Sequence, residues 1–305
     1  MRDSRSACLV LHGKAAMREE VRAAVRAVRD EGIDVDVRVT WEAGDAERFA
    51  REASEEGFGV VVAGGGDGTV SQVAAGIMAA KDSERVSSSL AVLPLGTAND
   101  LAHAGGIPLE ATAALRLAVF GTSSKIDVGS VNERSFVNMA TGGFGTRVTV
   151  STPRELKKVL GGVAYLLTGL THFTSIRPQR GRFTGPGFTW EGQFLVLAVG
   201  NGRQAGGGHR LCPDALLDDG LFDVNVLPKL PDHELPHALR ELLQEGRRAF
   251  DRNVVHARVA SLEIATGEAF QVNLDGEPAQ GTHFRFEVLK GRLPMKLPDG
   301  CPLLS

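Results

Sequence analysis

The chain of 305 residues has a formal net charge of −3, and 43% of its residues are hydrophobic. This length predicts about two domains, each with enough apolar residues for a core. Acidic and basic residues are mixed along the chain, which argues against a nucleic-acid-binding face and against a polybasic membrane anchor. The three cysteines, Cys8, Cys212 and Cys301, are too widely separated for a metal-binding motif and favour a reducing cytoplasm.

The first 126 residues alternate short apolar runs with amphipathic segments, which predicts a layered βαβ domain. The apolar run at 7–11 is too short for a signal-peptide core or a membrane-spanning helix, so we expect neither. The expected elements are strands at 7–11 and 35–40, helices at 15–30, 45–56 and 109–120, and two strand–loop–helix units that begin near residues 60 and 90.

From residue 127 onward, strand-like runs dominate and are separated by Asp-Gly and glycine-rich turns. We expect strands at 135–138, 147–150, 194–199, 222–226, 258–264, 269–272 and 283–288, with one helix at 232–250. The tail 289–305 contains Pro294, Pro298 and Pro302, so we expect it to leave the sheet and pack back on the first domain. The predicted fold class is α/β plus β, with a Rossmann-like nucleotide domain at 1–126 and a β-rich, sandwich-like domain at 127–288.

The segment VVVAGGGDGTVS at 60–71 carries an apolar strand directly into a glycine-rich loop and a helix. Gly64, Gly65, Gly66 and Gly68 surround Asp67, and glycines let backbone N–H groups approach a bulky anion at the positive end of a helix. A tight strand-to-helix turn is the alternative, but four glycines in five positions favour a phosphate site. The spacing matches neither the dinucleotide fingerprint G-x-G-x-x-G nor a Walker A loop.

A second segment, LAVLPLGTANDLA at 90–102, has the same organisation of strand, Gly-Thr turn and helix. Upstream, the strand at 35–40 ends in Thr40, so three strands each carry a hydroxyl or a glycine turn at the carboxyl end. In a parallel sheet these ends share one edge, where α/β proteins bind ligands at the switch in strand order. We therefore predict a phosphate-binding site at this edge.

Two carboxylate-rich segments of the second domain are candidates for metal binding and proton transfer. In PDALLDDGLFDV at 213–224, four aspartates surround a glycine; such oxygen ligands suit Mg²⁺ or Ca²⁺, but an acidic surface turn has the same composition. In NLDGEP at 273–278, Asp275 and Glu277 flank a glycine in what could be an ordinary Asp-Gly hairpin turn. If this loop closes over the phosphate edge, one carboxylate could accept a hydroxyl proton while the other orients a metal or the loop.

A third motif, H-E-x-x-H, stands at 233–237 and is typical of zinc hydrolases. In that motif both imidazoles project from the middle of a helix. Here Pro231 and Pro236 place His233 and His237 in an opening turn, which disfavours the zinc site.

The combination of GGGDGT with PLGTAND resembles the diacylglycerol kinase catalytic family, in particular the bacterial YegS lipid kinases. The likeness extends along the whole chain, through VRVTWEAGDA at 37–46, NMATGGFGTRV at 138–148, GNGRQAGGGHRLCPDALLDDGL at 200–221, NLDGEP at 273–278 and CPLL at 301–304. The resemblance implies an ATP-dependent kinase that transfers the γ-phosphate to a hydroxyl of a glycerol-bearing lipid, of the diacylglycerol or phosphatidylglycerol class.

The resemblance also implies roles for individual residues. Glu277 would be the proton acceptor, with Asp275 as a second candidate, and Mg²⁺ would bridge the phosphates of ATP. Asp67 would hold the hydrated metal or the acceptor, or would instead cap the helix that starts at Thr69. The expected nucleotide-binding residues are Thr40, Gly64, Gly65, Gly66, Asp67, Gly68, Thr69, Val70, Ser71, Gln72, Thr97 and Asn99.

A second Mg²⁺, or a Ca²⁺, is implied for the acidic segment of the second domain. Its expected ligands are the side chain of Asp219 and the carbonyl groups of Leu216 and Leu221. The chain departs from the family pattern at Ser71 and Gln72, where Asn-Glu is usual, so a carboxylate near the nucleotide is lost. His12 replaces a usual asparagine, and we transfer no contact to its turn.

A lipid kinase would act in the cytoplasm, with transient peripheral contact with the inner membrane surface. The segment GGVAYLLTGLTHF at 161–173 is the most apolar candidate for this contact, although an ordinary packed helix has the same composition. Two alternative functions share the glycine-rich loop: a kinase acting on NAD or another small molecule, and a non-catalytic nucleotide sensor. The lipid acceptor and the oligomeric state are not predicted from the sequence.

Overall fold

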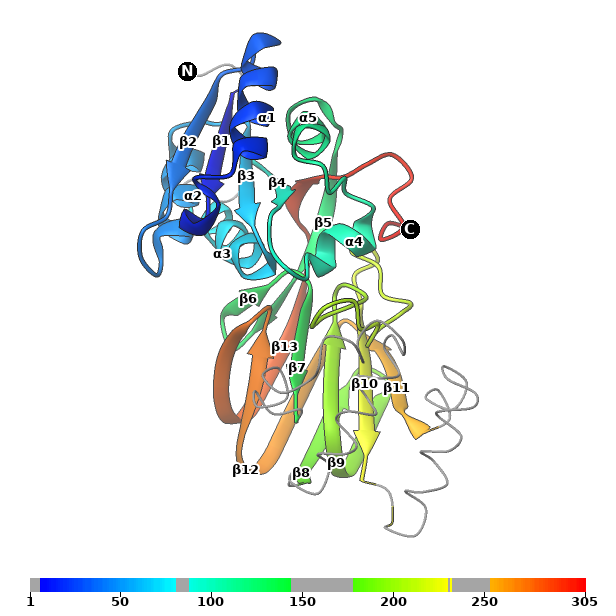
Figure 1. Ribbon diagram of the computed structural model, residues 1–305. Coiled ribbons are helices and arrows are strands. Elements are labelled where there is room, and N and C mark those ends of the chain that lie inside the picture. Colours follow the sequence, from blue (N-terminus) through cyan, green and yellow to red (C-terminus); the bar gives the residue numbers. More distant parts are fainter. Residues whose placement is uncertain (1–5, 81–87, 144–177, 230, 232–252) are drawn as a thin grey trace.

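The computed structural model describes residues 6–80, 88–143, 178–229, 231 and 253–305 (Figure 1). The helices predicted at 161–173 and 232–250, the strand predicted at 147–150 and the H-E-x-x-H segment lie outside these residues. Among the described residues, an α/β half with parallel strands and a β-rich half with antiparallel strands share one continuous sheet.

Four parallel strands in the order β2-β1-β3-β4 form the centre of the N-terminal half. Its elements are β1 (Ala7–Leu11), α1 (Glu19–Asp30), β2 (Val35–Val39), α2 (Asp45–Glu55), β3 (Val60–Gly65), α3 (Asp67–Met78), β4 (Ser89–Pro94), α4 (Asp100–Gly105) and α5 (Ala111–Phe120). Helices α2 and α3 pack with Cys8 and Val10 on one face, whereas α1 and α5 pack with Leu9 and Leu11 on the other. Alternate residues of a strand are therefore buried on opposite faces, as in parallel sheets covered by helices on both sides.

The strand order places the phosphate-loop segments at a topological switch point. From β1 the chain first adds β2 on one side and then crosses to add β3 on the other. The carboxyl ends of β1 and β3 therefore flank the position where α/β sheets open a ligand crevice.

The helix predicted at 15–30 begins later, at Glu19, because a 3-10 turn, η1 (Gly13–Ala15), follows β1. The hydroxyl of Thr40 accepts the Gly13 N–H at 3.2 Å, and Nδ1 of His12 accepts the Lys14 N–H at 3.2 Å. A Cβ on Gly13 would lie only 2.5 Å from the Thr40 carbonyl oxygen, so glycine is required for this close approach. These contacts turn the chain before α1 can start.

Antiparallel strands make up the C-terminal half, in the order β11-β10-β9-β7-β12-β13. They are β5 (Ser123–Val131), β6 (Arg134–Phe136), β7 (Met139–Gly142), β8 (Gln179–Gly185), β9 (Phe188–Gly200), β10 (Phe222–Pro228), β11 (Val255–Val259), β12 (Ser261–Leu274) and β13 (Glu277–Lys296). Aromatic rings fill their core: Phe136 stacks on Phe222, and both meet Phe286 edge-on. This geometry adds to the stabilisation that burial of the rings already provides.

Several strand predictions in this half are wrong in their boundaries. The run at 135–138 covers only the end of β6, because residues 137 and 138 form a bend before β7. The run at 258–264 is divided between β11 and β12, because the chain changes partner strand near Ala260. The tail does not leave the sheet at residue 289, since β13 continues through Pro294 to Lys296. The proline is tolerated because the strand is already irregular there, with Gly291 at φ 56° and a register shift between Leu289 and Leu293.

Strand β13 connects the two halves of the molecule (Figure 1). Its first part pairs with β12, its second part pairs with β5, and Met295 pairs with Leu90 of β4. Beyond the strand, Leu297 and Leu303 are buried in the same cluster as Val10 of β1. The C-terminal residues thus complete the core of the parallel-sheet half.

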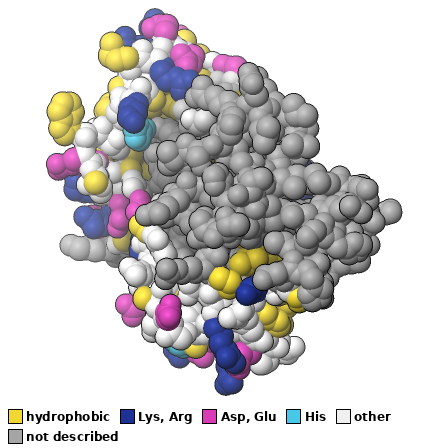
Figure 2. Space-filling model, turned by 60° about the horizontal axis from the view of Figure 1, so that its bottom comes forward, with side chains coloured by type: hydrophobic (Ala, Val, Ile, Leu, Met, Phe, Trp, Pro, Cys, Tyr) yellow, Lys and Arg dark blue, Asp and Glu magenta, His cyan; other side chains and the backbone are white. Residues whose placement is uncertain are grey.

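The described surface is polar, with few large apolar side chains. On the face shown in Figure 2, basic and acidic side chains lie interspersed over the described part of the surface. Trp41, directly after β2, is 95% exposed, and Leu109 and Phe120 are each about half exposed. Among the residues described, no helix is both long enough and apolar enough to cross a bilayer.

Candidate active site

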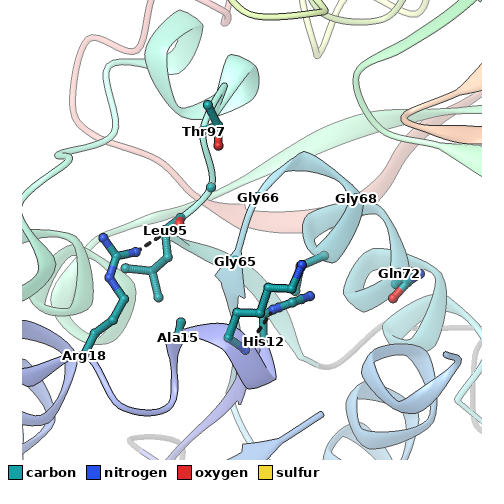
Figure 3. Close-up of a pocket in the computed structure, with 12 residues that line it drawn as sticks. His12, Ala15, Arg18, Gly65, Gly66, Gly68, Gln72, Leu95 and Thr97 are labelled. Carbon is teal, nitrogen blue, oxygen red and sulfur yellow. Dashed lines mark hydrogen bonds between the residues drawn. The ribbon is translucent and has the colours of Figure 1, made fainter. Parts of the chain in front are cut away.

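A pocket of about 670 Å³ opens at the carboxyl ends of the parallel strands, where α3 begins (Figure 3). It lies at the switch point between β1 and β3, so the predicted location of the phosphate site at this edge coincides with a cavity. The residues that line it are His12, Lys14, Ala15, Arg18, Gly65, Gly66, Gly68, Thr69, Gln72, Leu95, Gly96 and Thr97.

The glycines of the two loops allow contacts that no other residue permits. A Cβ on Gly65 would lie 2.3 Å from Oγ1 of Thr69, and one on Gly96 would lie 2.5 Å from the Cα of Gly66. The loops after β3 and β4 therefore touch backbone to backbone. Gly66 stands at the N-cap of α3 and has no side chain with which to cap the first turn, so N–H groups at the positive helix end are available to an anion.

Basic side chains form another part of the pocket lining, called here the basic wall. His12, Lys14 and Arg18 come from the turn between β1 and α1, and Nη1 of Arg18 donates to the carbonyl of Leu95 at 3.0 Å (Figure 3). This bond ties the β1–α1 turn to the loop after β4. Our sequence reasoning did not assign these three residues, although the basic segment HGKAAMR directly follows β1, which borders the switch point.

Two predicted nucleotide contacts support the loops without lining the cavity. The hydroxyl of Thr40 holds the Gly13 N–H. Asn99, in the left-handed region at φ 49°, accepts the Gly96 N–H at 2.9 Å and donates to the Gly96 carbonyl at 3.0 Å. Both side chains fix the shape of the pocket, while Thr97 lines it and its contact with the nucleotide stays a prediction.

Asp67 links the first glycine loop to the second loop–helix unit. Its carboxylate accepts the N–H groups of Asp100 and Leu101, each at 3.1 Å, at the start of α4. The alternative that Asp67 caps its own helix is wrong, because α3 starts at Asp67 itself and the capped helix is α4. Its predicted contact with the metal or the acceptor stays a prediction.

The NLDGEP segment forms a two-residue hairpin between β12 and β13. Asp275 and Gly276 both have positive φ, 48° and 106°, and Leu274 pairs with Glu277 across the turn. The Asp275 carboxylate accepts the N–H groups of Val137 at 2.6 Å and of Met139 at 2.8 Å, and also that of Asn138. Asp275 therefore anchors the hairpin to the β6–β7 connection.

The two carboxylates of the hairpin have different environments. Burial raises the pKa of Asp275 above its ordinary value, the three backbone N–H groups oppose this, and the charge of Asp67 adds to the increase. Glu277 is exposed, and its Oε1 accepts a hydrogen bond from Nε2 of Gln72 at 3.4 Å. Because Gln72 also lines the pocket, this contact places Glu277 beside the glycine loop.

The acidic turn of the second half is largely satisfied by protein groups. Asp219 forms an ion pair with Arg258 and accepts the Leu221 N–H at 2.9 Å, while Asp218 accepts the Ser305 N–H at 2.9 Å. In the described parts of the chain, no group of three or more His, Cys, Asp or Glu side chains converges on a metal position. The metal site predicted at Asp219 and the carbonyls of Leu216 and Leu221 therefore stays a prediction.

The glycine loops, the start of α3 and the basic wall form a site suited to the phosphates of a nucleotide. A family model described as "Diacylglycerol kinase catalytic domain" matches residues 6–131, and one described as "YegS C-terminal NAD kinase beta sandwich-like domain" matches residues 138–296. The two matches cover the α/β half and nearly all of the antiparallel half.

Individual proteins give the same result. A "Probable lipid kinase YegS-like" of Pseudomonas aeruginosa (strain UCBPP-PA14) is 54% identical over 99% of this chain and 97% of its own length. A protein of the same description from Alcanivorax borkumensis is 50% identical over 99% of this chain and 100% of its own length. A solved structure described as a diacylglycerol kinase from Bacillus anthracis shares the fold, with a TM-score of 0.76 at 23% identity over 97% of this chain and 98% of that one.

The chain belongs to the YegS-like lipid kinase family, whose catalytic domain is that of the diacylglycerol kinases. It is a kinase, a phosphotransferase that acts on an alcohol group, and the family implies ATP as the phosphate donor. The resemblance on which the sequence prediction rested is thereby confirmed.

Proposed function

We propose that this protein transfers the γ-phosphate of ATP to a hydroxyl group of a glycerol-bearing lipid, of the diacylglycerol or phosphatidylglycerol class. The observation that carries the proposal is the position of Glu277. This exposed carboxylate lies beside a pocket that is lined by the glycine loops and by His12, Lys14 and Arg18.

The residues of the pocket fit a nucleotide polyphosphate. Glycines bring backbone N–H groups close to the ligand, and the start of α3 adds the positive end of a helix. The basic wall neutralises further negative charge. We propose that the parallel-sheet half, residues 1–126 with the tail 289–305, is a Rossmann-like nucleotide domain, and that 127–288 form a sandwich-like domain that presents the lipid.

The reaction needs a base for the acceptor hydroxyl and a site that holds the phosphates of ATP and of the ADP that leaves. Glu277 takes the proton of the lipid hydroxyl while the hydroxyl oxygen forms a bond to the γ-phosphorus. The bond from the γ-phosphorus to the bridging oxygen breaks, and ADP leaves with that oxygen. Most of the catalysis then comes from in-line positioning and from charge neutralisation by the loop and the basic wall.

We expect Mg²⁺ to bind with ATP and to neutralise its phosphates. Asp67, between the glycines of the loop, is our candidate to orient it through water; its charge adds to the effect of burial, the main cause of the raised pKa of Asp275. A lipid acceptor also requires peripheral contact with a membrane surface, for which we propose transient association with the cytoplasmic face.

The test is transfer of labelled γ-phosphate from ATP to mixed micelles that contain diacylglycerol or phosphatidylglycerol, in the presence of Mg²⁺. Glu277→Gln is the matched variant, since it retains size and removes the base. We expect labelled lipid from the wild type and about 10²–10⁴-fold less from the variant. Binding of ATP without any labelled lipid would contradict the proposal and support a nucleotide sensor.

NAD should be tested as an acceptor in parallel, because the matched C-terminal family model is described by its likeness to an NAD kinase domain. The same reaction mixture, with NAD in place of the micelles, tests this acceptor. Labelled NADP formed faster than labelled lipid would replace the lipid proposal.

A further inference from the structure

Gln72 joins two parts of the site that are far apart in sequence. It lies in the second turn of α3, the helix that starts at the glycine loop, and it lines the pocket. Its Nε2 also donates to Oε1 of Glu277, 205 residues away on β13. Of the pocket-lining residues, Gln72 is the one whose side chain has this described contact with the hairpin.

The hairpin fixes the backbone of Glu277 but leaves its side chain free to rotate. The backbone is held by the Asp275 carboxylate, by the left-handed turn, and by the Gly276 N–H, which donates to Oδ1 of Asn273 at 2.7 Å. Glu277 is exposed at the start of β13, and an exposed glutamate populates several rotamers. In the part of the chain that the structure describes, the hydrogen bond from Gln72 is the side-chain contact that restricts Glu277 to a rotamer beside the pocket-lining helix.

The side chain of Gln72 is suited to this task. An amide donor can bond to a carboxylate without adding charge. Val70 and Val73 of α3 are buried, so the helix holds Gln72 on a rigid support. We propose that Gln72 is a positioning residue that holds Glu277 over the phosphate pocket. This inference rests on the proposed function, in which Glu277 accepts the proton of the lipid hydroxyl.

A double-mutant cycle tests the inference. Gln72→Met keeps the length and flexibility of the side chain but removes the donor, and it is made in the wild type and in Glu277→Gln. In the wild type we expect kcat for lipid phosphorylation to fall about twofold to tenfold, the range of one hydrogen bond. In the Glu277→Gln background, Gln72→Met is expected to leave the residual kcat unchanged, because Gln72 acts through Glu277.

Gln280→Met is the control, since Gln280 is an exposed glutamine on the same strand that does not line the pocket. It should match the wild type in kcat, and all variants should share its melting temperature. An equal loss of kcat from Gln72→Met in both backgrounds would overturn the inference, as would an increase in KM for ATP with unchanged kcat. Both results require an active wild type, so they differ from failure of the proposed function, in which the wild type itself labels no lipid.

Discussion

The edge of the parallel sheet and the acidic turn at 213–224 both carry dense sequence motifs, but the fold uses their polar groups differently. In the acidic turn, Asp218 and Asp219 contact Ser305, Leu221 and Arg258. At the sheet edge, the first turn of α3 follows a glycine that cannot cap it, and basic side chains face a cavity.

The number of charged residues in a motif is therefore a weaker guide to a site than the groups that the fold leaves open. The hairpin at 273–278 has one carboxylate that is occupied by protein groups and, two residues on, one that is open. Asp275 is occupied by backbone N–H groups, whereas Glu277 is exposed beside the pocket.

The largest contrast is expected between the two hairpin carboxylates. Asp275→Ala leaves the N–H groups of Val137, Asn138 and Met139 without their acceptor, and should cost about 2–4 kcal/mol of unfolding free energy. Glu277→Gln should leave stability unchanged and abolish most of the transfer activity. Chemical denaturation and the labelled-phosphate assay measure the two effects, and equal stability of both variants would show that Asp275 does not anchor the hairpin.

The glycine loop should show a similar contrast between neighbouring positions. In Gly65→Ala the new Cβ meets the side chain of Thr69, and such overpacking costs about 1–3 kcal/mol. Gly68→Ala is the control, because a Cβ at Gly68 meets nothing within 4 Å. Thermal melts should show a lower melting temperature for Gly65→Ala alone; identical melts would mean that the loop adapts readily.

Much of the fold was predictable because local patterns determined it. The apolar runs at 7–11 and 35–40 became β1 and β2 almost residue for residue, and the glycine loop and the Gly-Thr turn met at one edge, as parallel strands require. The change of partner strand near Ala260 and the extension of β13 through Pro294 were missed, since both depend on which strands become partners.

For the site, the sequence predicted the phosphate loop and the importance of the hairpin but not the division of labour within it. The three N–H donors to Asp275 come from residues more than 130 positions away, and Arg18 meets Leu95 across 77 positions. Such contacts leave no periodic signal in the chain. The basic wall and the bond from Gln72 to Glu277 therefore emerged only from the structure.

Addition of a divalent cation tests whether the acidic turn binds the metal predicted there. If Mg²⁺ or Ca²⁺ binds to Asp219 with the carbonyls of Leu216 and Leu221, free metal at ten times its Kd should stabilise the folded protein by about 1.4 kcal/mol. Asp219→Asn should remove this gain. The measurement is the melting temperature with and without the metal, and a gain of the same size in the variant would place the ion elsewhere.

An effect confined to acidic pH is expected for Asp45, which supports the loop after β2 next to Thr40. The N–H groups of Glu42 and Trp41, followed by Arg48, lower the pKa of Asp45 from 3.8 to about 2. Because the pKa is lower in the folded state, the stabilisation is fully present above about pH 4 and is lost as the pH falls toward 2. Asp45→Asn cannot titrate, so its stability should decline less steeply than that of the wild type over this interval. Denaturant unfolding at a series of pH values would show parallel curves if Asp45 carries no such coupling.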